Sequence, residues 1–244
     1  MRLPKIEDIN VRSSQEELLD LEEHSLDQID IIYDNMNKIN RWLGGDKPTI
    51  SALKRKVKSI DKDEILIIDV GSGGGGMCRN ASDLLMRMKR KHRVVGLDIN
   101  DDSLKIARNN STDYKHVSFE KIDIFSEQFT ELKPDIILST LTFHHLKNEE
   151  IIQLLNNCFK KHNPILIVND LHRSRFAFHL FKLLGFVISF HYVNRVDGLI
   201  SILRAFKRRD LEKLDKQIKT TFKGIESSIK WRFAFRWLWI IENK

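Results

Sequence analysis

The sequence has few of the residues that build disulfide frameworks, and it lacks the long apolar runs that cross membranes. Its 244 residues include two cysteines, Cys78 and Cys158, which excludes a disulfide framework and a cysteine-based zinc site. No apolar run approaches the ~18 residues needed to span a bilayer. The first ten residues carry charges throughout and have no apolar h-region, so we expect no secretory signal. These absences favour a cytoplasmic, globular protein in a reducing compartment.

Most of the chain also has no excess of positive or negative charge. Hydrophobic residues make up 41% of the sequence, enough to bury a sizeable core, and the net charge is +7. From Ile200 to Lys244 there are 12 Lys and Arg against 5 Asp and Glu, while the first 199 residues balance. A basic C-terminal region of this kind meets an anionic small molecule, an anionic lipid surface or nucleic acid, or is a solvated face without a partner.

Short apolar runs alternate with stretches of helical length from residue 64 onward. Ile65–Ile68 is a continuous apolar run between Glu64 and Asp69, the pattern of a strand buried on both faces of a parallel sheet. Similar runs are Arg93–Leu97, His116–Lys121, Asp135–Ser139 and Ile165–Val168, and the helical stretches between them are Met77–Lys91, Asp102–Asn110 and Asn148–Lys161. This alternation predicts βαβ units and a doubly wound α/β sheet.

The two flanks of this region have patterns of their own. Residues 15–43 carry apolar side chains at three- and four-residue steps, which predicts one or two helices. We expect residues 1–60 to form a helical cap and residues 61–244 to form the main domain. The aromatic-rich, partly alternating stretch Trp231–Ile241 predicts a closing antiparallel strand. Five phenylalanines indicate an apolar pocket or a membrane-facing cap: Phe176, Phe178, Phe181, Phe186 and Phe190.

A glycine-rich turn follows the first predicted strand, in the sequence Asp69-Val-Gly-Ser-Gly-Gly-Gly-Gly76. Such a strand-to-helix turn lets a ligand approach the backbone, with the N-terminal amides of the helix facing it. Gly71, Gly73 and Gly76 also satisfy the G-x-G-x-x-G fingerprint of nicotinamide dinucleotide enzymes. The turn alone leaves both classes of ligand open.

Acidic residues before this turn and at the ends of later predicted strands favour one of these two classes of ligand. The pattern Asp69-x-Gly-x-Gly-x-Gly75 resembles motif I of the class I S-adenosylmethionine-dependent methyltransferases. In that family the second strand ends in an acidic residue that accepts the ribose hydroxyls, here Asp98, and the third is followed by one that contacts the adenine amino group, here Asp123. The resemblance implies these donor-binding residues: Asp69, Gly71, Ser72, Gly73, Gly75, Asp98, Ile99, Asp123, Ile124 and Ser139.

The chain is most similar in detail to small-molecule methyltransferases of the ubiquinone and menaquinone biosynthesis and polyketide or pigment pathway type. The resemblance implies a Rossmann-like sheet, mostly parallel with an antiparallel C-terminal strand, and S-adenosyl-L-methionine as the methyl donor. It also implies a cap over the donor, in which Arg41 pairs with the methionine carboxylate. From this resemblance we expect a small, partly apolar acceptor that is methylated on oxygen or carbon.

Histidines supply the candidate bases, because a phenol or carboxylic acid acceptor needs a proton removed near neutral pH. His144 and His145 follow the fourth predicted strand and His172 follows the fifth. The carboxyl ends of the strands are where open α/β sheets place their sites. A capping or packing role remains an alternative for each, and the sequence predicts no metal site.

Three other functions remain as alternatives. The basic C-terminal region favours an RNA or other nucleic-acid methyltransferase, but the fourth strand ends in Ser139-Thr-Leu-Thr-Phe rather than an acidic or Asn residue followed by Pro-Pro-aromatic. A non-catalytic donor-binding protein would keep the same motifs. A nicotinamide oxidoreductase would leave Asp69 and Asp123 unexplained. The sequence sets neither the oligomeric state nor the acceptor.

Overall fold

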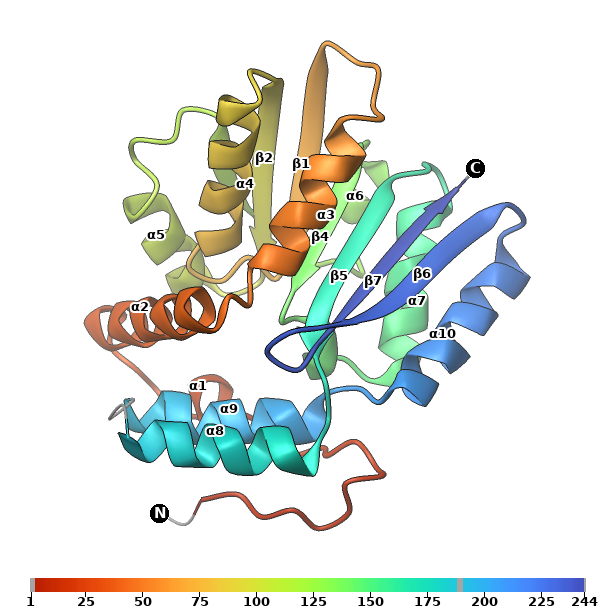
Figure 1. Cartoon of the computed structure of the whole chain (residues 1–244). Helices are drawn as coiled ribbons and strands as arrows, with labels where there is room; N and C mark the ends of the chain where they lie inside the picture. Colours follow the sequence, from red (N-terminus) through yellow and green to blue (C-terminus); the bar gives the residue numbers. More distant parts are fainter. Residues whose placement is uncertain (1–2, 188–190, 244) are drawn as a thin grey trace.

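The apolar runs that begin at residue 64 form the central strands of a seven-stranded sheet (Figure 1). The computed structural model describes residues 3–187 and 191–243. The strands are β1 (Glu64–Val70), β2 (Lys91–Asp98), β3 (Val117–Lys121), β4 (Ile136–Thr140), β5 (Ile165–Leu171), β6 (Ile225–Arg232) and β7 (Arg236–Asn243). Their order is β3-β2-β1-β4-β5-β7-β6; β1 to β5 run parallel, and β7 pairs antiparallel with both β5 and β6. The predicted Rossmann-like sheet is confirmed.

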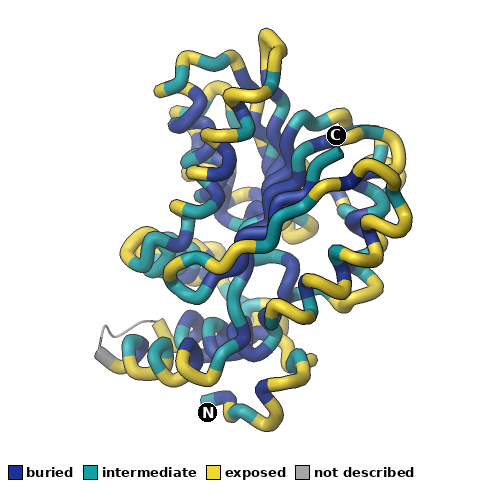
Figure 2. Tube along the Cα trace, turned by 45° about the vertical axis from the view of Figure 1, so that its right-hand side comes forward, coloured by how far each residue is buried: buried dark blue, intermediate teal, exposed yellow. Residues whose placement is uncertain are grey.

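Helices cover both faces of this sheet and one of its edges. The described helices are α1 (Leu18–Leu21), α2 (Leu26–Leu43), α3 (Lys47–Val57), α4 (Gly76–Arg87), α5 (Asp101–Asn109), α6 (Glu127–Glu131), the 3₁₀ turn η1 (Phe143–His145), α7 (Asn148–Phe159), α8 (Arg175–Val187), α9 (Tyr192–Arg204) and α10 (Arg208–Thr221). One core cluster joins α3, α4 and α5 to the sheet, and another joins α6, α7 and α10 to it. Figure 2 shows the buried strands in the middle and exposed residues on the outer helices. Among the described helices, none is both long and apolar enough to cross a membrane.

The C-terminal end of the sheet is a hairpin, whereas the sequence predicts a single strand over Trp231–Ile241. A tight turn at residues 233–235 separates β6 from β7, and Ala234 and Phe235 take positive φ angles of 63° and 54°. Every residue of β7 from Arg236 to Ile241 is buried, while Trp231 and Phe233 are exposed. The sequence pattern does not show where β6 ends and β7 begins, because aromatic residues occur on both sides of the turn. Those in β7 lie in a strand covered on both faces, whereas Trp231 in β6 and Phe233 in the turn are exposed.

A layer of helices lies across the carboxyl edge of the sheet (Figure 1). α1 and α2 come from the expected cap, but α3 packs into a core cluster of the sheet instead. α8 and α9 complete the layer from the middle of the chain. Two small apolar clusters hold it together, one of Ile9, Ala177, Phe178, Leu199, Ile202 and Leu203, the other of Leu18, Ile32, Val193, Val196 and Ile200. The layer is therefore built by two distant segments rather than by residues 1–60 alone.

Buried polar side chains fix this layer to the sheet. The Arg173 guanidinium, 1% exposed, donates to the carbonyl of Ile9 at 3.0 Å and to Asp210 at 2.8 Å. The Asn169 amide in β5 donates to the carbonyl of Gly45 at 2.8 Å, which holds the turn between α2 and α3. Buried donors are costly to leave without partners, so these bonds set where the N-terminal segment and α2 lie.

Candidate functional site

The glycine turn after β1 has a backbone that only glycine adopts without strain. Gly71, Gly73 and Gly75 take φ angles of 67°, 47° and 74°. A Cβ at Gly71 would lie 2.4 Å from the Thr142 side chain, and one at Gly75 would lie 2.5 Å from the Phe119 ring. The turn runs directly into α4, whose first amides face away from the helix. Within the turn, the amides of Gly71 and Ser72 donate to the carbonyl of Leu97 and that of Gly75 donates to the carbonyl of Ser72. The turn is therefore a rigid backbone support at a helix N-terminus, the kind of place where a ligand can approach the backbone closely.

Asp98 is held next to this turn at the end of β2. Its Oδ2 accepts a hydrogen bond from the amide of Gly73 at 2.9 Å, and its Oδ1 accepts one from the amide of Asn100 at 3.0 Å. The buried hydroxyl of Ser72 has no hydrogen-bond partner among the described residues. A half-buried carboxylate fixed beside a glycine turn matches what a nucleoside with ribose hydroxyls requires, so these residues fit S-adenosylmethionine.

Two side chains of α2 cover the turn, and the sequence analysis missed both. The Tyr33 ring lies against Gly73 and Gly74, 3.1 Å from a Cβ placed on either, and its hydroxyl shares a 2.6 Å hydrogen bond with Ser103. The amide oxygen of Asn37 lies 2.6 Å from a Cβ placed on Gly76. Burial raises the pKa of Tyr33 to about 12. The only sequence signal is their spacing of four residues, which puts them on one face of the helix.

Two of the predicted donor-binding residues lie inside the fold. Asp69 is 2% exposed, and the Cys78 thiol donates to its Oδ2 at 3.4 Å. Burial raises the pKa of Asp69 to about 7. Ser139 is fully buried within β4. Thr142 is the side chain from this segment that reaches the turn, where its hydroxyl donates to the carbonyl of Val70 at 3.1 Å.

The remaining predicted residues lie at the edge of the sheet or on α2. Asp123 is exposed after β3, where its Oδ1 accepts from the amide of Phe125 at 2.8 Å. Ile99 is exposed after β2, and Ile124 is partly buried against the core. Arg41 is exposed in the last turn of α2. Their donor-binding roles stay predictions.

A cavity of about 370 Å³ lies between the carboxyl edge of the sheet and the helical layer. Its walls are mostly apolar and come from α2, α8, α9 and the β6–β7 turn, and Phe176 and Phe181 of the predicted phenylalanines line it. Phe190 lies outside the described residues. Leu141, which follows β4, lines the cavity with a positive φ of 59°, a strained conformation for a leucine. The chain between β4 and η1 therefore touches both the glycine turn and the cavity.

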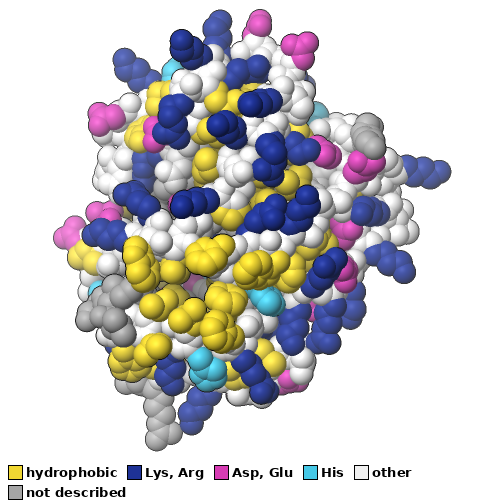
Figure 3. Space-filling model, in the orientation of Figure 1, with side chains coloured by type: hydrophobic (Ala, Val, Ile, Leu, Met, Phe, Trp, Pro, Cys, Tyr) yellow, Lys and Arg dark blue, Asp and Glu magenta, His cyan; other side chains and the backbone are white. Residues whose placement is uncertain are grey.

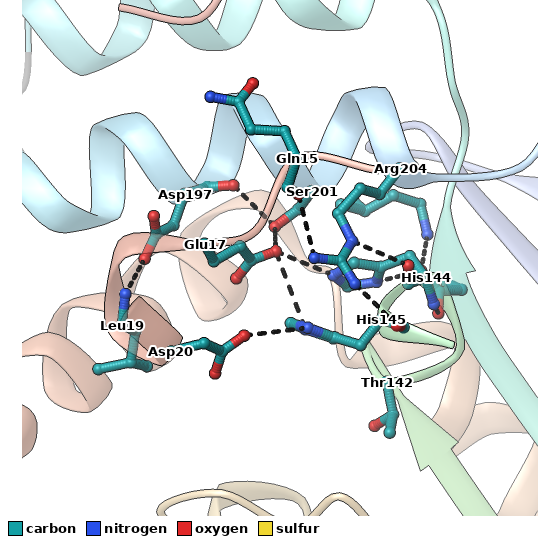
Figure 4. Close-up of polar contacts among 12 residues, drawn as sticks. Gln15, Glu17, Leu19, Asp20, Thr142, His144, His145, Asp197, Ser201 and Arg204 are labelled. Carbon is teal, nitrogen blue, oxygen red and sulfur yellow. Dashed lines mark hydrogen bonds and ion pairs between the residues drawn. The ribbon is translucent and has the colours of Figure 1, made fainter. Parts of the chain in front are cut away.

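A chain of buried charged groups lies beside the cavity, and two of its members, Glu17 and His144, line it. Figure 4 shows the polar contacts around these two residues. The Nδ1 of His144 lies 2.8 Å from Oδ1 of Asp170, and its Nε2 lies 3.5 Å from Oε1 of Glu17. Burial lowers the pKa of His144, but the two carboxylates outweigh burial and raise it to about 9. Burial raises the pKa of Glu17, and the two adjacent histidines outweigh it, giving about 2. His144 is thus a cation held between two anions at neutral pH.

The same groups tie η1 to the helical layer. The Ser201 hydroxyl on α9 donates to Oε1 of Glu17 at 2.6 Å. Arg204 donates to the carbonyls of His144 at 3.2 Å and His145 at 2.7 Å (Figure 4). Glu17 and η1 therefore reach the same point from sequence positions about half the chain apart.

His145 and His172 present their rings to the cavity. The His145 ring stacks on that of His144 with 4.3 Å between ring centres, and its Nε2 lies 3.9 Å from Oε1 of Glu17. His172 lies beside the hairpin, where its amide donates to the carbonyl of Phe235 at 2.8 Å. Burial, and then the charges of Lys207 and Arg173, lower the pKa of His172.

Glu17, His144 and His145 also have the donor atoms that a metal ion would use. One such atom from each lies within 4.8 Å of the other two. The Nδ1 of His144 is hydrogen-bonded to Asp170, whereas its Nε2, 3.5 Å from Glu17, has no hydrogen-bond partner among the described residues. A metal bound at Nε2 would have to displace a proton that the nearby carboxylates stabilise on this ring.

Comparisons with known proteins agree with this geometry. A family model described as a methyltransferase domain matches residues 61–196, more than half of the chain. The chain belongs to this methyltransferase family. S-adenosylmethionine is the donor that the family uses. The predicted class of protein and the predicted donor are confirmed.

Individual relatives of this methyltransferase are distant. Phosphoethanolamine N-methyltransferase of Plasmodium falciparum (isolate 3D7) is 27% identical over 124 residues, which cover 50% of this chain and 45% of that protein. The chain thus spans less than half of that curated relative.

Solved structures share the fold. The plantazolicin methyltransferase BpumL with bound SAH, the demethylated form of the donor, superposes with a TM-score of 0.64 at 14% identity, over 87% of this chain and 90% of that one. Magnesium protoporphyrin IX methyltransferase (ChlM) from Synechocystis PCC 6803 with bound SAH gives 0.57 at 16% identity, over 87% and 94%.

Replacing Asp98 by Ala should weaken binding of the donor product. The variant loses a charge-assisted hydrogen bond to ribose and frees the Gly73 amide, so we expect affinity for S-adenosylhomocysteine to fall by about 1.5–3 kcal/mol, measured by calorimetry. Asp101→Ala removes an exposed carboxylate three residues on and serves as the control. Unchanged affinity in Asp98→Ala would show that this carboxylate does not hold the ribose.

The buried His144 should make stability depend on pH in the alkaline range. Its folded pKa of about 9 lies above the ordinary 6.5, so its contribution is complete below pH 6.5 and is lost as pH rises through 9. We expect the difference in free energy of unfolding between the wild type and His144→Gln to shrink by about 3 kcal/mol over that range, measured by urea denaturation. Groups common to both proteins, Asp69 among them, cancel in this difference. A difference that stays flat with pH would mean that His144 is not held as a cation.

Proposed function

We propose that this chain transfers a methyl group from S-adenosylmethionine to the oxygen or carbon of a small, largely apolar acceptor of phenolic, quinone-like or polyketide-like type. The observation that carries the proposal is the position of the cavity. Thr142 packs on the glycine turn, while Leu141, His144 and His145 line the cavity. A donor on the turn and an acceptor in the cavity would therefore meet across one short segment.

The lining of the cavity supports an acceptor with an apolar body and a polar end. Its walls are aliphatic and aromatic, as is usual for sites that take small molecules. Arg236, 3% exposed, is a cavity-lining cation whose Nη2 donates to Asn40 at 2.6 Å. Its Nε and Nη1 have no hydrogen-bond partner among the described residues. An oxygen on the acceptor would give such donors a partner.

The names of similar structures point the same way. One plantazolicin methyltransferase was solved with a monoazolic desmethylPZN analog and SAH, at a TM-score of 0.62. Others are magnesium protoporphyrin IX methyltransferase and the pyocyanin biosynthetic protein PhzM, the latter at 0.53. These names support a small-molecule acceptor and do not single one out.

In the proposed mechanism, the protein aligns the reactants and moves one proton. The bound donor supplies an electrophilic methyl group on a positively charged sulfur. Asp98 and the glycine turn hold the donor, and Tyr33 and Asn37 keep water from it. His145 takes the proton of a phenolic acceptor as that oxygen gains the methyl group. His144, already protonated, is a positioning residue that fixes the ring of His145 by stacking.

Nucleic acid is less well supported as the acceptor. No residue of α10, which carries much of the basic C-terminal region, lines the cavity. α10 packs on α7 and β6, on the opposite face of the sheet from α3. The cations of α10 thus lie outside the place where a methyl group would be transferred, whereas Arg236 is a cation of the same basic region that lines the cavity.

The acceptor class can be tested by partitioning labelled product. Purified protein and methyl-labelled S-adenosylmethionine are incubated with cell extract, which is then divided into organic-soluble, nucleic-acid and protein fractions. We expect label in the organic fraction. Label in nucleic acid would overturn the proposal, and donor binding without label in any fraction would favour a non-catalytic donor-binding protein.

Filling the cavity should block this labelling. Leu180→Trp places a large ring among the lining residues, so we expect organic label to fall at least about tenfold while S-adenosylhomocysteine binding is unchanged. Leu183→Trp alters an exposed leucine one turn along the same helix and should leave labelling intact. Equal labelling by both variants would place the acceptor elsewhere.

The role of His145 can be separated from a structural one by its pH profile. His145→Gln should lower the rate of methyl transfer about 100-fold near neutral pH, without weakening donor binding. The deficit should shrink as pH rises and a phenolic acceptor ionises unaided, whereas a misfolded or misaligned site would keep it. The exposed His116→Gln is the control.

A further inference from the structure

The mouth of the cavity is surrounded by exposed aromatic side chains. We define the aromatic rim as Phe176 on α8, Trp231 and Phe233 on the hairpin and Trp42 at the end of α2, which are 67%, 47%, 76% and 65% exposed. Figure 3 shows hydrophobic side chains gathered on the face where these elements meet. Monomeric proteins seldom leave four large aromatic groups together in water, so this rim indicates an interaction surface.

Ring contacts and a groove make the rim one continuous surface. The ring of Phe235, which is partly buried, contacts two members of the rim: its centre lies 5.7 Å from that of Phe176 and 6.2 Å from that of Trp231. Trp42 and Phe233 line one groove beside the cavity. Because Phe176, Trp231 and Phe233 also line the cavity, an apolar molecule passing over the rim would enter it directly.

Positive charge adjoins the rim on α3. The exposed face of this helix carries Lys47, Lys54 and Arg55, and the helix has no acidic residue. Lys47, Arg55 and Arg232 line the same groove as Trp42 and Phe233. Figure 3 shows Lys and Arg side chains over much of the surface next to the apolar band. Aromatic groups flanked by cations match the chemistry of an anionic lipid surface.

We propose that the aromatic rim and the basic face of α3 dock this protein on an anionic lipid bilayer, from which an apolar acceptor enters the cavity. The second part rests on the proposed function. An apolar acceptor dissolves in the bilayer, and each of its methylene groups would cost about 0.8 kcal/mol to bring through water. A cavity that opens at the lipid surface avoids that transfer. Within the basic C-terminal region, this placement assigns the lipid contact to the hairpin rather than to α10, and it adds the basic face of α3.

Vesicle sedimentation of the full chain tests the docking. We use vesicles of phosphatidylcholine alone and vesicles of an equimolar mixture of phosphatidylcholine and phosphatidylglycerol. We expect binding to the mixed vesicles that weakens with added salt, and little binding to phosphatidylcholine alone. Lipids brominated on the acyl chain should quench the fluorescence of Trp42 and Trp231, since Trp237 and Trp239 are buried.

Matched variants locate the surface. The double variant Trp42→Ser, Phe233→Ser and the double variant Lys54→Glu, Arg55→Glu should each lower affinity for mixed vesicles at least about tenfold. Met86→Ser, an exposed apolar residue on α4, is the control for the first pair. Lys213→Glu, Lys216→Glu on α10 reverses two exposed charges and is the control for the second.

Each outcome bears on the docking separately from the proposed function. Loss of binding in the α10 variant instead of the α3 variant would overturn the surface assigned here, as would equal binding by all variants. Self-association through the rim, seen as a mass that falls in Phe233→Ser, without vesicle binding would replace the lipid by a second copy of the chain. S-adenosylhomocysteine binding and organic labelling, measured on the same samples, report the proposed function independently.

Discussion

The chain of buried groups from Glu17 through His144 to Asp170 joins the three parts of the molecule on which the site depends. Glu17 comes from the N-terminal segment, His144 from the turn after β4, and Asp170 from the end of β5. A buried charge is stable only when it is paired, so none of the three can move without leaving another unsatisfied. The helical layer is held over the carboxyl edge of the sheet by this requirement, and the cavity is the space that remains between them.

The turn between β4 and η1 uses this anchoring. Leu141 is held in a strained conformation, and a residue keeps such a conformation only where its surroundings over-determine it. Here the surroundings are Thr142 on the glycine turn and His144 between two carboxylates. Because the turn is fixed at both ends, donor and acceptor would face each other at a set distance, which is what methyl transfer requires from a protein.

The folded structure, and not the sequence, shows which charges lie next to the cavity mouth. The excess of cations lies after Ile200 in the sequence, yet the cations that adjoin the cavity mouth include Lys47 and Arg55, from a region that is nearly balanced overall. Charges act through space and within about 8 Å at physiological salt, so sequence totals say little about which surface meets a partner. The aromatic rim shows the same effect, since its members come from α2, α8 and the hairpin.

By itself, the sequence determined the parts of this protein that are coded locally. Periodicity predicted the parallel sheet, and the resemblance carried by the Asp69–Gly76 turn and Asp98 at the end of β2 implied the family and the donor. Strand burial, glycine conformation and a strand-terminal acidic residue each depend on a few adjacent positions. The tertiary structure alone decided the cavity, the cover of Tyr33 and Asn37 over the turn, the pairing of Glu17 with His144 and the hairpin in place of one strand. These depend on contacts between segments separated by tens to more than a hundred residues, and neither periodicity nor a motif records which partner a buried side chain finds.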